Sequence, residues 1–430
     1  MSEASAGTTS DSEQQARAAH EERHASWLEL FFDLIVAAGV AQIADRLREA
    51  PTPANTLACV AMFYAVWSVW TAFCAYANVA GERTRTRALL LAMLGMGVMA
   101  AAIPGTMPEL LPHDDTFATG RTQAFIVAFV LCRGLAGSAT RRAGKVIAFW
   151  PAAQGLMIAP WVVSLAVGET ARYWLWGAGV VLDVALSIRA ASDPESAEKL
   201  TQHMLRQQAA EDRHIVRRLI SHYRPIQRPD ITIAEVERGH LEERLSLFVI
   251  IVLGEALAQL VAAATRVSWT RVADIGLIVG FALLVGIWQL TVRYGFGPVP
   301  GSADAPMRPW VSLPTHFAVV AGIAATAAGL GSLALELTAT AQTGARWYLC
   351  GGLIVYFLAG ALSGIGRSVP RAWTVGWTVP CVAAAVVLGL VGGALPGWLL
   401  TVLAAVVVAW QVSYEPLRNR LARRPEALAR

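Results

Sequence analysis

Charged residues are scarce in this sequence. Asp, Glu, Lys and Arg make up 15% of its 430 residues, against about 25% in a typical soluble domain. Hydrophobic residues make up 55%, and the mean hydropathy is +0.49. This balance excludes a chain of soluble domains and indicates a polytopic membrane protein. The net charge of +4 is small and no basic–aromatic cluster appears, so we do not expect a nucleic-acid partner.

Other signals are lacking as well. Residues 1–25 are polar and acidic, without the apolar stretch of a cleavable signal peptide. HExxH motifs and Gly-rich phosphate loops do not occur, so we expect neither a metal nor another cofactor. The apolar segments contain no lysine, which excludes Schiff-base chemistry inside the membrane. The five cysteines lie inside apolar segments at unrelated spacings, which argues against disulfides: Cys59, Cys74, Cys132, Cys350 and Cys381.

Long apolar segments dominate what is present. A membrane-spanning helix needs about 20 apolar residues. The segments predicted to span are 27–44, 55–80, 88–105, 122–138, 146–167, 173–190, 245–264, 272–292, 310–336, 347–364, 373–391 and 395–412. The fold class expected is therefore an all-α polytopic bundle of about twelve spans.

The segments suggest a division of the chain. A polar tail (1–26) precedes a first six-helix unit (27–190), a polar connector (191–243), a second six-helix unit (244–412) and a basic tail (413–430). With the N-terminus inside, most of the 35 Lys and Arg fall on the cytoplasmic side. We therefore predict a multi-pass protein of the cell membrane with both termini and the connector in the cytoplasm.

An internal repeat is suggested by two similar stretches. Leu28–Ile43 (LELFFDLIVAAGVAQI) aligns with Leu245–Leu260 (LSLFVIIVLGEALAQL), which pairs Phe31 with Phe248. The following spans pair Trp70 with Trp288 and Tyr76 with Tyr294. Chance similarity between apolar helices is the alternative, but Trp and Tyr are rarer than Leu or Ala. The pattern favours a 6+6 duplication with parallel halves.

Two acids lie near the start of the first span. Glu29 and Asp33 are four residues apart and therefore share one helix face. Asp33 lies about 9 Å into the span, at 1.5 Å per residue. An acid at that depth indicates a functional site that faces protein or water. For Glu29, an interfacial acid stabilised by the helix dipole is an equal alternative.

The seventh span carries a polar stripe of its own. His240, Arg244, Phe248 and Glu255 recur on one face, with Glu255 about 15 Å deep. Glu255 has either a chemical role or a structural pairing with Arg244 or Arg133. We expect Asp33 and Glu255 to face one shared cavity, with Glu29 nearer its cytoplasmic mouth.

Aromatic residues also lie inside spans. Trp67, Trp70 and Trp288 are too deep for an interfacial belt, so they either pack helices or line an aromatic cavity. His316 begins the ninth span, where a capped or interfacial histidine is the alternative to a binding role. Asp183 lies within the sixth span, with Arg189 or another helix as its expected partner.

The stretches SWLELFFDLIVAAGVAQIA and HLEERLSLFVIIVLGEALAQL together resemble the bacterial low temperature requirement A (LtrA) family. The segments YAN (Tyr76–Asn78), FIVAFVLCR (Phe125–Arg133) and HFAVVAGI (His316–Ile323) support the likeness, which runs from Trp27 to about Trp410. The resemblance implies an integral membrane protein, in a family named for a growth phenotype. The polar positions that it marks are Glu29, Asp33, Asn78, Arg133, His240, Glu243, Arg244, Glu255 and His316.

The sequence also departs from that family. Where relatives continue after the Asn with an acidic run, this chain has VAGERTRTR with only Glu82, and Phe129 stands where relatives favour Tyr. If those acids bind a cation or substrate in relatives, that activity is in doubt here.

Two functions fit these features. The favoured one is a membrane-embedded enzyme in which a buried carboxylic acid protonates a lipophilic, isoprenoid-type substrate and aromatic faces stabilise the cation, as in a terpene cyclase without metal. The alternative is a proton-coupled transporter with midplane acids. A structural or lipid-sensing role is a third, weaker reading. The expected partners are the lipid bilayer and a lipophilic small molecule; the sequence leaves the oligomeric state open.

The two functions would use the same residues in three roles. The proposed catalytic acids are Asp33, Glu255 and Glu29. The proposed substrate-binding residues are Trp67, Trp70, Tyr76, Asn78, Phe248, Trp288 and His316. The proposed supporting residues are Arg133, His240, Glu243 and Arg244.

Overall fold

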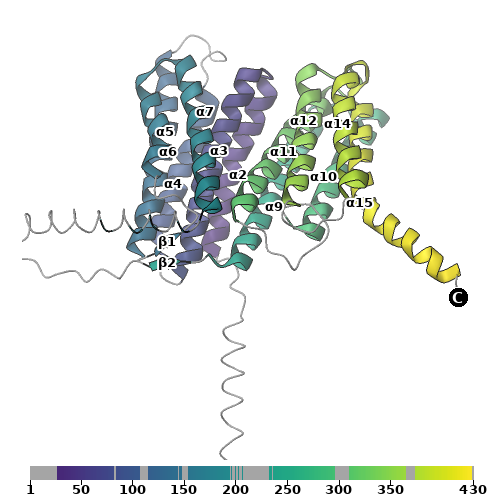
Figure 1. Ribbon diagram of the computed structural model, residues 1–430. Helices are drawn as coiled ribbons and strands as arrows, with labels where there is room; N and C mark the ends of the chain where they lie inside the picture. Colours follow the sequence, from purple (N-terminus) through teal and green to yellow (C-terminus); the bar gives the residue numbers. More distant parts are fainter. Residues whose placement is uncertain are drawn as a thin grey trace, which may run out of the picture.

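The fold is described from a computed structural model, shown in Figure 1. It describes residues 27–81, 84–106, 115–143, 145–147, 154–193, 232–234, 236–295, 309–364 and 373–428, with isolated positions at 195, 199, 202 and 206. The described chain is a bundle of roughly parallel and antiparallel helices, as the composition predicts. The only paired strands in these ranges are β1 (Lys145–Ile147) and β2 (Thr232–Ala234), which run parallel at one end of the bundle.

Each predicted span corresponds to a helix. The first group comprises α2 (Trp27–Glu49), α3 (Pro53–Ala80), α4 (Thr86–Ala102), α5 (Asp115–Arg142), α6 (Gln154–Val163) and α7 (Glu169–Ser192). The second group comprises α9 (Arg238–Ala264), α10 (Arg271–Tyr294), α11 (Pro309–Leu335), α12 (Thr343–Ser363), α14 (Val379–Val391) and α15 (Gly397–Leu428). Short turns of other helix types extend several of them, at Ile103–Gly105, Ser164–Ala166, Thr374–Thr378 and Gly392–Ala394.

Ten of the described helices are long and apolar enough to cross a membrane. The two predicted spans outside that set are the fifth and the sixth. The fifth span was predicted to begin at residue 146, but β1 occupies that position and the apolar helix covers only Leu156–Ala166. The sixth corresponds to α7, which is long enough but carries Arg172, Asp183 and Arg189.

The helix ends follow from local sequence. Thr52 caps α3 by accepting a hydrogen bond from the Asn55 backbone N–H, and Pro53 occupies the first helical position, where no N–H is needed. Thr270 caps α10 in the same way. Gly81 and Gly295 end α3 and α10 with positive φ angles of 58° and 78°, a conformation that favours glycine. Two predicted boundaries shift: α9 begins before residue 244, and helix α15 continues into the predicted basic tail.

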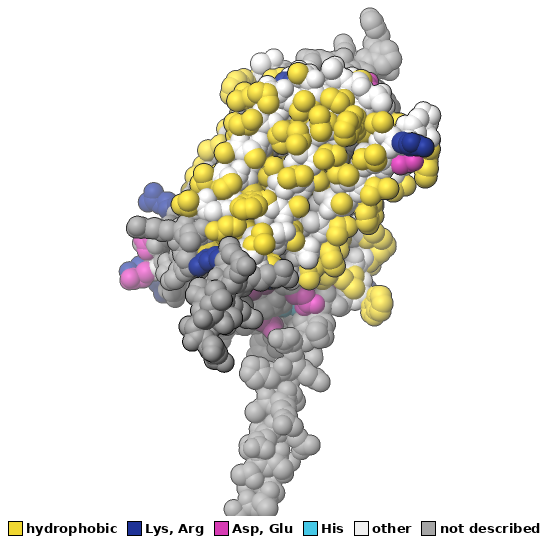
Figure 2. Space-filling view, turned by 90° about the vertical axis from the view of Figure 1, so that its right-hand side faces the viewer, with side chains coloured by type: hydrophobic (Ala, Val, Ile, Leu, Met, Phe, Trp, Pro, Cys, Tyr) yellow, Lys and Arg dark blue, Asp and Glu magenta, His cyan; other side chains and the backbone are white. Residues whose placement is uncertain are grey.

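Much of the outer surface is apolar. Large side chains such as Leu34, Leu131, Ile278 and Leu390 are exposed along the helices. Figure 2 shows one face of the bundle, where apolar side chains cover most of the surface and charged ones are few. An exposed apolar surface of this extent fits lipid rather than water. The structure therefore supports a multi-pass membrane protein; it does not show which side the termini occupy.

Close helix packing depends on small residues in the second group. A methyl group added at Gly322 would come within 2.7 Å of the Gly352 carbonyl oxygen, and one at Gly329 within 2.3 Å of the Leu349 backbone nitrogen. Helices α11 and α12 therefore touch backbone to backbone, as membrane helices do where small residues face each other.

The two groups arrange their helices in a similar order. In the first group α2 packs against α4, α4 against α5 and α3 against α7; the corresponding pairs in the second are α9–α11, α11–α12 and α10–α15. The residues that the sequence alignment pairs nevertheless lie in unlike surroundings. Trp70 is fully buried whereas Trp288 is 45% exposed, and Phe31 is 53% exposed whereas Phe248 is fully buried. The duplication is therefore not shown and stays a prediction.

The two groups meet along α2 and α3 from the first and α9 and α11 from the second, near the middle of Figure 1. Helix α3 lies deepest, and 89% of its most apolar stretch is buried, against 39% for α10. Because the polar and aromatic side chains singled out in the sequence lie mostly on these central helices, the fold brings them to the contact between the groups.

Candidate functional site

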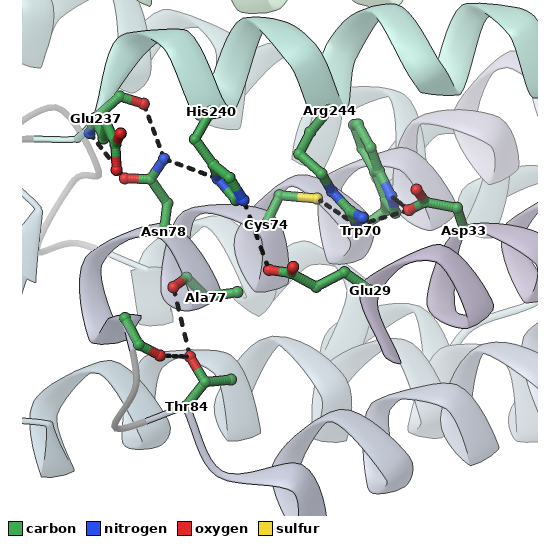
Figure 3. Close-up of polar contacts among 11 residues, drawn as sticks. Glu29, Asp33, Trp70, Cys74, Ala77, Asn78, Thr84, Glu237, His240 and Arg244 are labelled. Atoms are coloured by element: carbon green, nitrogen blue, oxygen red, sulfur yellow. Dashed lines mark hydrogen bonds and ion pairs between the residues drawn. The ribbon is translucent and has the colours of Figure 1, made fainter. Parts of the chain in front are cut away.

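Polar side chains from three helices meet where the two groups touch (Figure 3). Asp33 lies six residues into α2 and Arg244 six residues into α9, so both are about 9 Å from the starts of their helices. Trp70, Cys74 and Asn78 follow one another at helical spacing toward the end of α3 and face the other two helices. The site therefore lies nearer the end of the bundle at which α2 and α9 begin.

The centre of the site is an ion pair between the groups. Arg244 Nη2 donates to Asp33 Oδ1 at 2.7 Å, and the two side chains are 2% and 0% exposed. Trp70 Nε1 donates to the same Oδ1 at 2.7 Å, and the Arg244 Nη2 group also lies 3.6 Å from Cys74 Sγ. An isolated charge at this depth would be costly, so pairing accounts for how both groups tolerate burial.

A second chain of contacts leads from the helix ends toward this pair. Asn78 Nδ2 donates to the Glu237 carbonyl at 2.8 Å, and the Glu237 N–H donates to Asn78 Oδ1 at 2.8 Å. This double contact fixes the orientation of the Asn78 amide. Its Nδ2 group then lies 3.2 Å from His240 Nδ1, which must accept.

His240 links that contact to the acid nearest the helix start. Because its Nδ1 accepts from Asn78, its Nε2 carries the hydrogen, and Nε2 lies 3.9 Å from Glu29 Oε1. Glu29 and His240 are both buried, so Glu29 faces protein rather than solvent.

His316 on α11 lies beside the site as a packed imidazole. Trp67 Nε1 donates to its Nδ1 at 2.9 Å, and its Nε2 donates to the Leu245 carbonyl at 3.0 Å. One nitrogen accepts and the other donates, which describes the neutral ring. Its ring stacks on Trp70 at 5.7 Å between centroids, and Trp70 contacts Phe248 at 4.3 Å. Four of the predicted binding residues, Trp67, Trp70, Phe248 and His316, thus form one aromatic cluster.

Other predicted residues have structural surroundings. The Tyr76 hydroxyl accepts from the Arg85 backbone N–H at 2.9 Å and holds the start of α4. Arg133 pairs with Asp183 at 3.2 Å and donates to the Ser68 carbonyl, so Asp183 contacts another helix rather than Arg189. The contacts of Arg133 with Ser68 and Asp183 hold α3, α5 and α7 together. Glu243 is half-buried and lies next to Arg244 in sequence.

Two of the predicted site residues have surroundings unlike those of the central pair. Glu255 does not share a site with Asp33, because it contacts Gln259 at 3.0 Å, and Gln259 in turn contacts Asp45 at 3.1 Å. Glu255 is eleven residues beyond Arg244 along α9, or about 16 Å. Trp288 on α10 is 45% exposed, unlike the fully buried Trp70 of the aromatic cluster.

Two participants were not assigned to the site from sequence: Cys74 and the backbone of Glu237. Cys74 lies four residues from both Trp70 and Asn78, so helical spacing could have placed it on their face. The Glu237 backbone carries no side-chain signal, and only its contact with Asn78 reveals it.

Comparison with known proteins decides the family. The sequence profile described as "Bacterial low temperature requirement A protein (LtrA)" matches residues 24–412. The chain belongs to the LtrA family. The match covers every helix that contributes to the site. No curated protein and no solved structure matches the chain.

Proposed function

We propose that this LtrA family protein is a proton-coupled membrane transporter in which Asp33 carries the proton. The observation that carries the proposal is the fully buried Asp33–Arg244 pair, which joins α2 of one helix group to α9 of the other. An intramembrane charge pair at the contact between two helix groups is a feature of transport sites. An ion pair inside one group, such as Arg133–Asp183, would not change when the two groups move relative to each other.

The geometry suggests how a proton would act. Arg244 and Trp70 both donate to Oδ1, so a proton on Asp33 would occupy Oδ2. Protonation removes the charge that holds Arg244 and thereby weakens the contact between the groups. A two-state arrangement of the groups would then be biased by one proton. The chain Asn78–His240–Glu29 lies between the helix ends and this pair, where a proton would enter.

The test is proton-driven accumulation. Proteoliposomes that contain the purified protein are given an imposed pH gradient and a mixed metabolite extract, and lumenal solutes are identified by mass spectrometry. We expect at least one solute to accumulate with the wild-type protein and not with Asp33→Asn. The matched control is Asp183→Asn, which neutralises another buried, ion-paired acid and should retain accumulation. Accumulation by Asp33→Asn, or none by the wild type, would contradict the proposal.

An acid-catalysed isomerase or cyclase is the second candidate, as the sequence favoured. The observation on its side is the aromatic cluster of Trp70, Phe248 and His316 next to Asp33, whose faces could stabilise a carbocation. Acid initiation requires a neutral Asp33, whereas here its Oδ1 accepts from a guanidinium. Membranes that contain the protein, incubated with polyprenyl substrates, would yield isomeric products lost in Asp33→Asn if this candidate were right.

A further inference from the structure

The buried ion pair leaves polar atoms that the helices do not satisfy. Among the described residues, Arg244 Nε and Nη1 and Asp33 Oδ2 are buried and have no hydrogen-bond partner. Arg244 is 1% exposed and Asp33 is 0% exposed, so these atoms do not face solvent. Buried groups of this kind are rare and call for an explanation, of which a ligand is one.

The unpartnered atoms have a definite chemistry. Arg244 presents N–H donors on two of its three nitrogens, and guanidinium donors match carboxylate and phosphate oxygens. Asp33 Oδ2 is an acceptor while ionised and becomes a donor once protonated. A ligand with acceptor oxygens would therefore satisfy Arg244 directly and would satisfy Asp33 only after Asp33 gains a proton.

The charges at the site also indicate that an anion would bind together with a proton. Asp33 and Arg244 cancel each other, so an added anion leaves one uncompensated negative charge in a buried site. A proton taken up with the anion restores neutrality. The other titratable groups near the pair are Glu29 on α2, Cys74 on α3 and His240 on α9, with the neutral His316 on α11 behind Trp70. Glu29 adds negative charge, which makes an anion without a proton less favourable still.

We propose that the ligand of this site is an organic anion with an apolar body, taken up together with one proton. Arg244 binds its carboxylate through one of its two unpartnered nitrogens, Nε or Nη1, and the proton occupies Asp33 Oδ2. The apolar body follows from the surroundings, because Trp70 donates to Asp33 and contacts Phe248, and both rings are fully buried. This inference rests on the proposed transport function and names its substrate class.

The first experiment uses the purified wild-type protein and three probes of one shape. Benzoate, benzamide and benzylammonium differ in charge, and acetate adds the carboxylate without the ring. We expect benzoate to raise the melting temperature in detergent at mildly acidic pH, acetate to raise it less, and the amide and the amine to have no effect. Stabilisation by benzylammonium, or equal effects of benzoate and benzamide, would overturn the anion assignment.

Variants locate the binding group. Arg244→Gln should weaken benzoate binding by about tenfold or more, the loss expected for one charge-assisted contact. Because this substitution leaves Asp33 unpaired, Asp33→Asn/Arg244→Gln is tested beside it, as a neutral pair that should fold and still fail to bind. Arg133→Gln removes another buried arginine that is paired with an acid, and this variant should bind as the wild type does. Unchanged binding in the double variant would overturn the role of Arg244.

Coupling is measured separately. In proteoliposomes, uptake driven by a pH gradient should not respond to an imposed membrane potential, because one anion and one proton carry no net charge. A solute that accumulates by proton coupling but proves cationic or neutral would contradict this inference and leave the proposed function intact. Binding of benzoate without any coupled uptake would contradict the proposed transport function and leave the anion site intact.

Discussion

Two polar clusters lie along the contact between α2 and α9, and they differ in both charge and burial. Near the helix starts, Asp33 faces the opposite charge of Arg244, and both are fully buried. Farther along, Asp45 and Glu255 are two acids bridged by the neutral amide of Gln259, and both acids are half-exposed. The positive charge of this cluster is Arg48, which pairs with Asp45 at 2.8 Å on the same helix and not across the two groups. Twelve residues, or about 18 Å, separate Asp33 from Asp45 on α2.

The difference shows what an acid in an apolar helix signifies. In the sequence, Asp33 and Glu255 give the same signal, and depth alone ranks Glu255 as the more unusual. In the structure, Asp33 depends on a partner from the other helix group, whereas Glu255 contacts its own helix and can reach the surface. A functional role is therefore better inferred from an enforced long-range pairing than from depth.

The largest effect should follow from removing the partner of Asp33. Arg244→Gln leaves a buried carboxylate without its counter-charge, which we expect to destabilise the protein by about 3–5 kcal/mol. Thermal unfolding in detergent measures the loss, and Asp33→Asn/Arg244→Gln should recover part of it. A double variant as unstable as the sum of the singles would show that the two charges do not interact.

A smaller effect should follow from weakening one contact of the pair. Trp70→Phe keeps an aromatic ring against Phe248 but removes the N–H donated to Asp33. Loss of a hydrogen bond to a charged group is worth about 2 kcal/mol. Trp67→Phe is the matched control, since it removes a donor to the neutral His316 and should cost less. The same unfolding assay would contradict this ranking if Trp67→Phe were the more damaging change.

Much of the fold could be predicted from sequence because hydropathy records the length of each span. The helical spacing of His240, Arg244 and Phe248 also placed them correctly on one face. The failures share a cause. Periodicity gives the face of a helix but not its neighbour, so Asp33 could not be matched with Arg244, 211 residues away.

Two further failures concern lipid and loops. In an apolar helix both the lipid-facing and the buried side read as hydrophobic, so Trp288 could not be told from Trp70 by composition. The fifth span was placed too early because Val146 and Ile147 are apolar enough to extend it, yet these two residues pair with Ile233 and Ala234. That pairing depends on a segment far along the chain, which a local window does not contain.

The smallest effect should come from the second cluster, and it tests the comparison most directly. Glu255→Gln keeps the size of the side chain and its position beside Gln259, and it removes one of two neighbouring negative charges. Interactions of partly exposed charges contribute about 0–1 kcal/mol, so stability should change by no more than that. Proton-driven accumulation in proteoliposomes should persist, whereas Asp33→Asn abolishes it. Asp45→Asn, which neutralises the other acid bridged by Gln259, serves as the matched control and should behave as Glu255→Gln does. If Glu255→Gln abolished accumulation as completely as Asp33→Asn, the two clusters would belong to one functional pathway, and burial with a paired charge would not be what distinguishes them.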